Sequence, residues 1–262
     1  MKRYPYLLIL FFLTFSAMAD PRLMVLDVGE GQAVLIQNKD HGILIDTGHP
    51  GMARHVLDRL DALGVKQLDY LILTHLHPDH AGGYFRLREA WPDTPVLYNG
   101  HPLPDDVSPD LTRWVNEALK QDARQGIFQT GTPLQWQGMT LEALWPETFA
   151  SNDLNTHSLV LLLRHGATQV LIMGDANQRV EQELLRHNHL PKNIDVLVVG
   201  HHGAKDASSA TFIDWIRPKV AVISVNRDNI RGYPATNVLQ RLEKAGARVL
   251  RTDQEGEIRL AL

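Results

Sequence analysis

The sequence contains no cysteine. This absence excludes disulfide bonds, thiolate nucleophiles, cysteine-ligated zinc and iron–sulfur clusters, so His, Asp and Glu are the side chains left to hold a metal tightly. The chain also has no excess of positive charge, because 26 Lys and Arg stand against 30 Asp and Glu and the net charge is −4. A mildly acidic chain has no global attraction for nucleic acid or an anionic membrane. A polyanionic substrate would therefore need a local site such as a bound metal.

The N-terminal residues are typical of an export signal. Lys2 and Arg3 precede the apolar stretch 7–15, and Ala17-Met18-Ala19 provides the small residues of a cleavage site. We expect residues 1–19 to be a signal peptide of a periplasmic or secreted protein that has no stable membrane association after cleavage. An uncleaved anchor is the alternative, although the apolar run is shorter than the ~20 residues of a spanning helix.

Residues 20–262 contain no repeat, low-complexity stretch or long linker, which predicts a single domain. Short apolar runs of strand length first cluster and then alternate with helical patterns. This order favours an α+β fold with sheets packed face to face and helices outside. The expected strands are Leu23–Val28, Ala33–Gln37, Gly42–Asp46, Asp69–Thr74, Thr94–Tyr98, Met139–Trp145, Leu159–Arg164, Gln169–Met173, Ile194–Val199, Lys219–Val225 and Arg248–Arg251. The expected helices are Met52–Leu63, Leu111–Arg124, Asn177–Arg186, Ala210–Ile216 and Thr236–Ala245.

Histidine is abundant, with 13 residues, and three histidines gather at the end of one expected strand. After Leu71-Ile72-Leu73 the chain continues Thr74-His75-Leu76-His77-Pro78-Asp79-His80. Each imidazole would need a polar partner if it were buried without a metal. The spacing predicts that His75 and His77 converge on one ion and that Asp79 and His80 reach a second ion nearby.

Three other expected strands also end in acidic residues or histidines. Asp46 follows Ile43-Leu44-Ile45, Asp175 follows Met173-Gly174, and His201-His202 follow Gly200. We expect Asp46 to support the histidines from behind and Asp175 to ligate or bridge metals. Either aspartate alone could be an ordinary turn residue, but strand ends at one sheet edge form a shared crevice. Apart from these five histidines and His157, the seven others are expected to be solvated or structural, and His49 is the one nearest to this crevice in the sequence.

These motifs resemble the metallo-β-lactamase superfamily of dinuclear metal hydrolases, and the His75-x-His77-x-Asp79-His80 signature carries the likeness. More narrowly, the segments resemble the stand-alone hydrolase domain of ComEC-type competence proteins. The matching segments are 26–33, 155–161, Gly174-Asp175, 200–203 and the stretch 223–234, which ends in Tyr233-Pro234. The resemblance implies a four-layer αβ/βα sandwich with metals in the groove between the edges of the two sheets.

The resemblance also implies a role for each site residue. His75 and His77 would hold the first metal, Asp79 and His80 the second, and Asp175 would bridge them. His202 would be a second-metal ligand and His201 would face the oxyanion of the substrate, or the two would exchange roles. The first metal would be completed by His157, by Asn155 or by water. Tyr233 stands where relatives usually have His, and Asp79, His201 and Tyr233 are the expected catalytic residues.

The sequence therefore predicts an exported metal-dependent hydrolase. Two divalent ions, with zinc favoured over manganese, would bring the pKa of a bridging water or hydroxide towards ~7. Gly82 and Gly83 N–H groups at a following helix start would help to hold an anion. A phosphodiesterase or nuclease acting on a small-molecule or nucleic-acid phosphodiester is the preferred interpretation. The alternatives are an amide, ester or lactam hydrolase and a non-catalytic accessory protein of DNA uptake.

Overall fold

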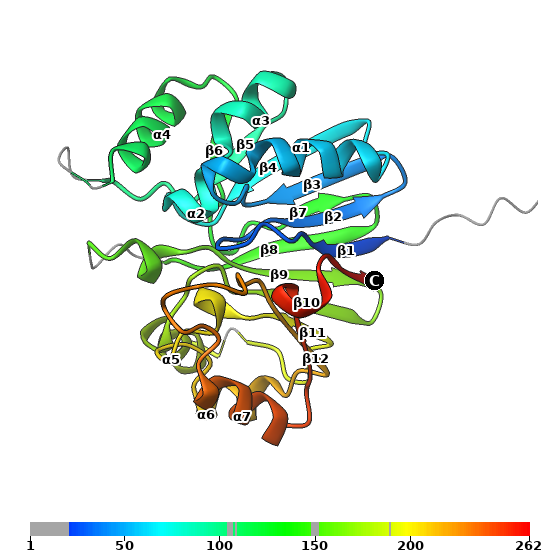
Figure 1. Ribbon diagram of the computed structural model, residues 1–262, viewed down its shortest axis with the longest axis vertical. Coiled ribbons are helices and arrows are strands. Elements are labelled where there is room, and N and C mark those ends of the chain that lie inside the picture. The colour runs from blue at the N-terminus through cyan, green and yellow to red at the C-terminus, as the bar shows by residue number, and fades with distance from the viewer. Residues whose placement is uncertain (1–20, 104–106, 108, 148–151, 189) are drawn as a thin grey trace, which may run out of the picture.

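Two seven-stranded sheets packed face to face form the centre of the fold (Figure 1). The computed structural model describes residues 21–103, 107, 109–147, 152–188 and 190–262, and the expected signal peptide lies outside these residues. The first sheet has the order β14 (Ile258–Ala261), β1 (Arg22–Val25), β2 (Val34–Asn38), β3 (His41–Ile45), β4 (Gln67–Leu73), β5 (Val96–Tyr98) and β6 (Gln125–Ile127). The last strand of the chain thus returns to the edge of the first sheet, antiparallel to β1.

The second sheet is built from the later part of the chain. Its order is β13 (Arg248–Arg251), β12 (Val220–Ile223), β11 (Val196–Val198), β10 (Thr168–Ile172), β9 (Val160–His165), β8 (Met139–Trp145) and β7 (Leu134–Trp136). Strands β10 to β13 run parallel, as do β3 to β6 in the first sheet. Each sheet therefore presents a set of strand C-termini at one edge.

Helices cover the outer face of each sheet. The first sheet is covered by α1 (Ala53–Ala62), α3 (Tyr84–Ala90) and α4 (Asp110–Gln121), and the second by α5 (Gln178–Arg186), α6 (Ala210–Ile216) and α7 (Thr236–Lys244). The short helices are α2 (Pro78–Ala81), α8 (Thr252–Glu255) and the 3-10 turns η1 (Pro50–Met52), η2 (Leu154–His157) and η3 (Gly200–Gly203). The expected α+β sandwich of four layers is confirmed. Among the described residues no helix has the length and apolar character needed to cross a membrane.

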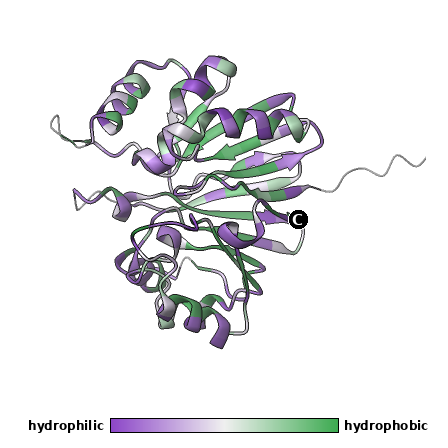
Figure 2. Ribbon diagram, in the orientation of Figure 1, coloured by the Kyte–Doolittle hydropathy of each residue, from purple (hydrophilic) through white to green (hydrophobic). Residues whose placement is uncertain are grey.

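Alternating side chains explain why both faces of a sheet are covered. Along β2, Val34 and Ile36 enter the core between the two sheets, whereas Leu35 enters the core under the helices of the first sheet. All three side chains are fully buried. Burying an aliphatic side chain of this size contributes about 1.5–3 kcal/mol, so the alternation stabilises both interfaces at once. Figure 2 shows hydrophobic residues concentrated in the strands and mixed with hydrophilic ones in the helices.

Candidate metal centre

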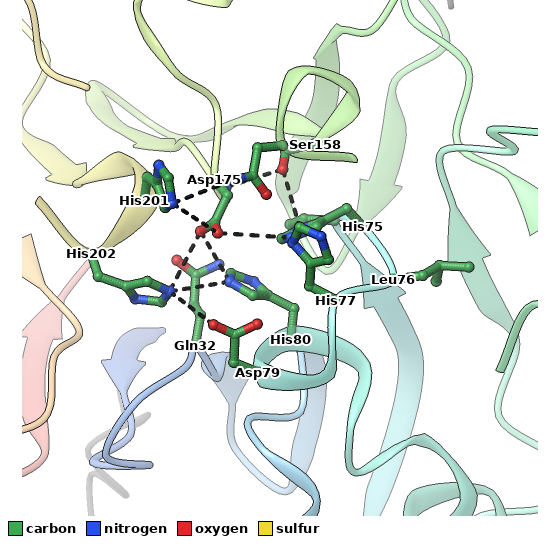
Figure 3. A network of polar contacts seen from close by, with 12 residues as sticks. Gln32, His75, Leu76, His77, Asp79, His80, Ser158, Asp175, His201 and His202 are labelled. Carbon is green, nitrogen blue, oxygen red and sulfur yellow. Dashed lines mark hydrogen bonds and ion pairs between the residues drawn. The ribbon is translucent and has the colours of Figure 1, made fainter. Parts of the chain in front are cut away.

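The C-terminal ends of four strands bring the expected site residues together (Figure 3). β4 leads into His75 and His77, β3 into Asp46, and β10 into Asp175, while η3 after β11 carries His201 and His202. His75, His80 and His202 are buried, and Asp175 is 2% exposed. A cluster of imidazoles and carboxylates removed from water to this degree requires charge compensation within the cluster.

Asp46 holds the loop that carries the histidines. Its Oδ1 accepts the backbone N–H of Thr74 at 2.7 Å, and its Oδ2 accepts Gln32 Nε2 and Thr74 Oγ1, both at 2.8 Å. Oδ2 also faces His80 Nδ1 at 2.7 Å, so this nitrogen donates its proton to the carboxylate. The buried carboxylate therefore fixes both the loop and the ring orientation of His80, as a residue behind a metal ligand does.

His80 and His202 turn the same kind of nitrogen towards one another. His202 Nδ1 lies 3.0 Å from the carbonyl oxygen of Ser224 and donates to it, just as His80 Nδ1 donates to Asp46. Both rings thus direct Nε2 into the cluster, where the two Nε2 atoms are 3.3 Å apart. Two nitrogen lone pairs at this distance repel each other unless a proton or a metal cation lies between them. This pair therefore fits a cation site.

Asp175 lies at the centre of the cluster. Its Oδ1 is 3.0 Å from His80 Nε2 and 3.6 Å from His202 Nε2, and its Oδ2 is 3.8 Å from His75 Nε2. The backbone N–H of Asp175 donates to Ser158 Oγ at 3.1 Å, which fixes the turn after β10. One carboxylate therefore faces both halves of the cluster, as a bridging ligand must.

The donor atoms form two overlapping groups that could each hold a metal ion. One group is His75, His80 and Asp175, and the other is Asp79, His80 and His202. The atoms of each group lie within 4.8 Å of one another. His77 adjoins the first group, because its Nδ1 is 3.0 Å from His75 Nε2. An all-histidine and carboxylate donor set suits zinc or manganese, so the residues present fit the implied metals.

His157 belongs to neither donor group, whereas Asn155 lies next to the metal centre. The ring of His157 packs edge-on against His101, with 4.0 Å between centroids, and its carbonyl accepts Asn99 Nδ2. Asn155 Nδ2 is 3.3 Å from His201 Nε2. Of the two candidates for the third position at the first metal, the structure places Asn155 beside the expected site residues and the His157 ring beside His101.

His201 lies beside Asp175, and Tyr233 packs against His201. His201 Nε2 is 4.0 Å from Asp175 Oδ2, and its Nδ1 is 3.3 Å from Asp206 Oδ1. The ring of Tyr233 packs against the ring of His201, with 5.7 Å between centroids. In the turn Gly200-His201-His202-Gly203, both histidines adopt positive φ, and their imidazoles point to different parts of the site (Figure 3).

A cleft of about 440 Å³ opens onto the cluster, a volume in the range of small-molecule sites. It is lined by Glu30, His49, His77, Pro78, Asp79, Pro109, Asn155, Asp175, His201 and Arg231. Sequence reasoning missed Glu30 and Arg231 as individual site residues. The sequence feature that could have pointed to them is their position inside two segments that resemble the family, 26–33 and 223–234. His49, which the sequence places near the crevice, lines the cleft.

The expectation that Gly83 would bind an anion is wrong. Its backbone N–H donates to Thr47 Oγ1 at 2.8 Å and is therefore already satisfied. Both glycines serve close packing instead. A Cβ on Gly82 would lie 2.2 Å from the carbonyl oxygen of Pro78, and a Cβ on Gly83 would lie 2.9 Å from atoms of Thr47.

Burial and the neighbouring carboxylates shift the pKa values of the site histidines in two opposite directions. Burial disfavours the charged form of His80, but Asp175 and Asp46 outweigh it and hold the pKa of His80 well above its usual value. Against the same burial, Asp175 and Asp79 raise the pKa of His202. Burial lowers the pKa of both His75 and His77. Despite burial, His80 and His202 hold the pKa of Asp175 well below its usual value, so this group is ionised at neutral pH.

These pKa shifts predict that metal binding near pH 7 releases protons from His80 and His202. A metal must displace the proton of a raised-pKa histidine, so affinity falls as the pH drops and rises until the pH exceeds the metal-free pKa. His75 and His77 are neutral at pH 7 and contribute no release. Titration of metal-free protein with zinc, by calorimetry in buffers of different ionisation heat, should show release of about one to two protons per chain. The His202→Ala variant should release fewer, and an absence of release in the wild type would contradict the assignment.

Comparisons with known proteins agree with this geometry. The profile of the "Metallo-beta-lactamase superfamily" matches residues 26–225. "Recombination protein 2" of Haemophilus influenzae is 33% identical over 255 residues, which are 95% of this chain and 30% of that protein. "ComE operon protein 3" of Bacillus subtilis is 33% identical over 260 residues, covering 89% of this chain and 32% of that protein. The chain therefore spans about a third of the length of these curated relatives.

The fold has the same relationship to solved structures. The crystal structure of the metallo-beta-lactamase fold protein YhfI from Bacillus subtilis superposes with a TM-score of 0.61 at 16% identity, covering 92% of this chain and 100% of that one. Sequence profile, curated relatives and fold agree with the paired His and Asp groups at the strand ends. The chain belongs to the metallo-beta-lactamase superfamily.

Proposed function

We propose that this chain is an exported dinuclear metal-dependent hydrolase that cleaves phosphodiester bonds in a small molecule or a nucleic acid. The observation that carries the proposal is the position of Asp175, whose two oxygens lie within 4.0 Å of imidazole nitrogens from His75, His80, His201 and His202. A carboxylate shared in this way suits two metals acting together in displacement at phosphorus.

The names of the curated relatives support the phosphodiester class. One relative is named as a recombination protein and another as a protein of the ComE operon. By resemblance to the superfamily, Asp175 stands where many β-lactamases have a cysteine ligand, and this chain contains no cysteine. Both facts argue against a lactamase centre of that kind. The cleft of about 440 Å³ holds a small molecule or a short stretch of single strand more readily than a duplex.

Each residue of the centre has a distinct task in this proposal. Asp79, His80 and His202 would hold one ion, and His75, His77 and Asp175 the other, with Asp175 shared. Bound divalent ions would supply a nucleophile from water at neutral pH and polarise the phosphoryl group. Asp79, at the cleft, can accept a proton, while His201 and Tyr233 can donate hydrogen bonds to oxygens of the substrate.

A comparison of two chromogenic substrates tests the proposal. Protein loaded with zinc or manganese should release nitrophenolate from bis-p-nitrophenyl phosphate, and a chromogenic lactam should show negligible turnover. The metal-free protein is the matched control, and it should be inactive on the diester. Rapid lactam hydrolysis without diester cleavage under both metals would reverse the assignment, because one metal centre supports several reactions and loops decide what is cut.

Export is the second part of the proposal, and it has a separate test. Residues 1–19 combine a positive start, an apolar run and a small-residue cleavage site. The mass of the protein recovered from the periplasm or medium of a producing bacterium should correspond to a chain that begins at Asp20. A protein that keeps its N-terminus and stays with the membrane fraction would indicate an uncleaved anchor instead.

A further inference from the structure

Among the described residues, Arg231 is the only Lys or Arg that lines the cleft at the metal centre. The same cleft is lined by three carboxylates, those of Glu30, Asp79 and Asp175. Its Nε forms an ion pair with Glu30 Oε1 at 3.0 Å, and its Nη1 lies 3.8 Å from Asp79 Oδ2. The side chain remains 48% exposed. The guanidinium is therefore held through Nε by Glu30, while Nη1 faces Asp79 at the edge of the metal centre.

The loop that carries Arg231 has a defined conformation. Asn229 Nδ2 donates to the carbonyl oxygens of Asn226 and Tyr233, at 2.7 and 2.8 Å, and Asn229 Oδ1 accepts the backbone N–H of Tyr233 at 2.7 Å. Just after the loop, the N–H of Ala235 donates to the carbonyl oxygen of Gly203 at 2.8 Å. The loop is thus tied to the turn that contains His201 and His202.

Glu30 is anchored to the same centre from the opposite sheet. Next to it, the carbonyl oxygen of Gly31 accepts Ser224 Oγ at 2.7 Å, and the N–H of Gln32 donates to the carbonyl oxygen of Asp79 at 3.1 Å. Gly31 has φ +135, and a Cβ there would lie 2.3 Å from the Asp79 carbonyl oxygen, so only glycine allows this approach. Both partners of the Arg231–Glu30 pair are therefore positioned relative to the metal ligands.

We propose that Arg231 binds a non-bridging oxygen of the anionic phosphodiester group and that Glu30 positions it, an inference that rests on the proposed function. Neither Nη group of Arg231 makes a hydrogen bond to the described residues, so both can donate to an oxyanion. An arginine fork matches the geometry of phosphate oxygens, and its charge is constant at every working pH. Once Asp79 is engaged by a metal, the nearest anion left for the fork is the substrate.

This role makes Arg231 a determinant of specificity for charge. A phosphodiester carries one negative charge at neutral pH, whereas a phosphotriester with the same nitrophenolate leaving group carries none. Arg231 should therefore favour the diester and be indifferent to the triester. A residue that only neutralised Asp79 would affect both substrates equally, because both use the same metal centre.

Arg231→Met tests the inference with bis-p-nitrophenyl phosphate and diethyl p-nitrophenyl phosphate as the pair of substrates. We expect kcat/KM for the diester to fall roughly ten- to hundredfold, the range of a hydrogen bond to a charged group, with triester hydrolysis and metal content unchanged. Arg231→Lys should recover part of the loss, because it keeps the charge but not the fork. Arg248→Met is the matched control, since Arg248 is exposed at the N-terminal end of β13 and pairs with Val220 away from the strand C-termini.

Calorimetric titration of the metal-loaded proteins with inorganic phosphate separates this inference from the proposed function. We expect Arg231→Met to weaken phosphate binding by a similar factor and Arg248→Met to leave it unchanged. A wild type that binds phosphate through Arg231 but cleaves no diester would contradict the proposed function and support the anion site. Phosphate binding that is equal in the wild type and Arg231→Met, or an equal loss on diester and triester, would overturn the anion site.

Glu30 requires a readout of its own because it acts through Arg231. Glu30→Ala should raise KM for the diester more than it lowers kcat, since a freed guanidinium samples more orientations before the substrate binds. Glu30→Gln, which retains an oxygen acceptor for Arg231, should restore part of the affinity. An identical KM for the diester in the wild type and Glu30→Ala would contradict the positioning role.

Discussion

Replacing Asp175 by alanine is expected to remove bound metal from both donor groups and to abolish hydrolysis. Asp175 belongs to the donor group with His75 and His80, and its Oδ1 also lies 3.6 Å from Nε2 of His202 in the other group, so its loss should weaken both sites at once. Two metals supply several kcal/mol of transition-state stabilisation, and their loss corresponds to a rate decrease of about a thousandfold or more.

Elemental analysis after dialysis, together with the diester assay, measures this effect. The wild type should carry two divalent ions per chain and Asp175→Ala close to none. Asp175→Asn keeps the volume and one oxygen but loses the charge, and we expect it to retain less metal than the wild type. Asp214→Ala is the matched control, because Asp214 is an exposed acid on α6. A variant without the Asp175 carboxylate that kept both ions and its activity would show that the bridge lies elsewhere.

The fold could be predicted from the sequence because short apolar runs of strand length alternate with clear amphipathic helical patterns. The helix at Ala210–Ile216 was predicted with its observed bounds, and the strands from β8 to β13 are close to their expected ranges. Three strands were missed, namely β6, β7 and β14, each only three or four residues long. At that length hydrophobic periodicity contains too little information to separate an edge strand from a loop.

For helix α3 the sequence predicts only a helix start after Gly82 and Gly83 and gives no range, for a different reason. It directly follows Gly82 and Gly83, and paired glycines usually indicate a turn. Here they allow the backbone to approach Pro78 and Thr47 without a side chain, and the chain continues as a helix. A property of tertiary packing thus overrode a local signal.

The metal centre was predictable to the extent that its residues stand at strand ends. His75, His80, Asp175 and His202 meet in two groups because the strands before them, which come from both sheets, end on the same side of the sandwich. Arg231 belongs to no strand end, and its side chain reaches the cleft through a loop closed by Asn229. The His157 ring is directed by its packing against His101, a residue 56 positions earlier in the chain. Such placements depend on contacts distant in the sequence, which local patterns do not encode.

Asp46→Ala is expected to destabilise the metal-free protein by about 3–5 kcal/mol, because a buried carboxylate that satisfies several donors is lost. The N–H of Thr74, the amide of Gln32 and Nδ1 of His80 would each lose their acceptor, and unsatisfied buried donors cost about 1–3 kcal/mol each before relaxation. The metal ligands themselves would remain, so zinc affinity should fall only about ten- to hundredfold, as it does when a group behind a ligand is removed.

Urea unfolding of metal-free Asp46→Ala, combined with zinc titration, separates this role from that of Asp175. For Asp46→Ala we expect a large loss in the free energy of unfolding and partial metal retention, whereas Asp175→Ala should lose metal from both groups. Asp46→Asn should be intermediate, because the amide accepts at one oxygen while its nitrogen cannot accept from Thr74 or His80. Loss of metal equal to that of Asp175→Ala, with no change in unfolding free energy, would make Asp46 a ligand. In that case His80 would be free to turn its Nδ1 elsewhere, and the tautomer that directs Nε2 towards the metals would need another cause.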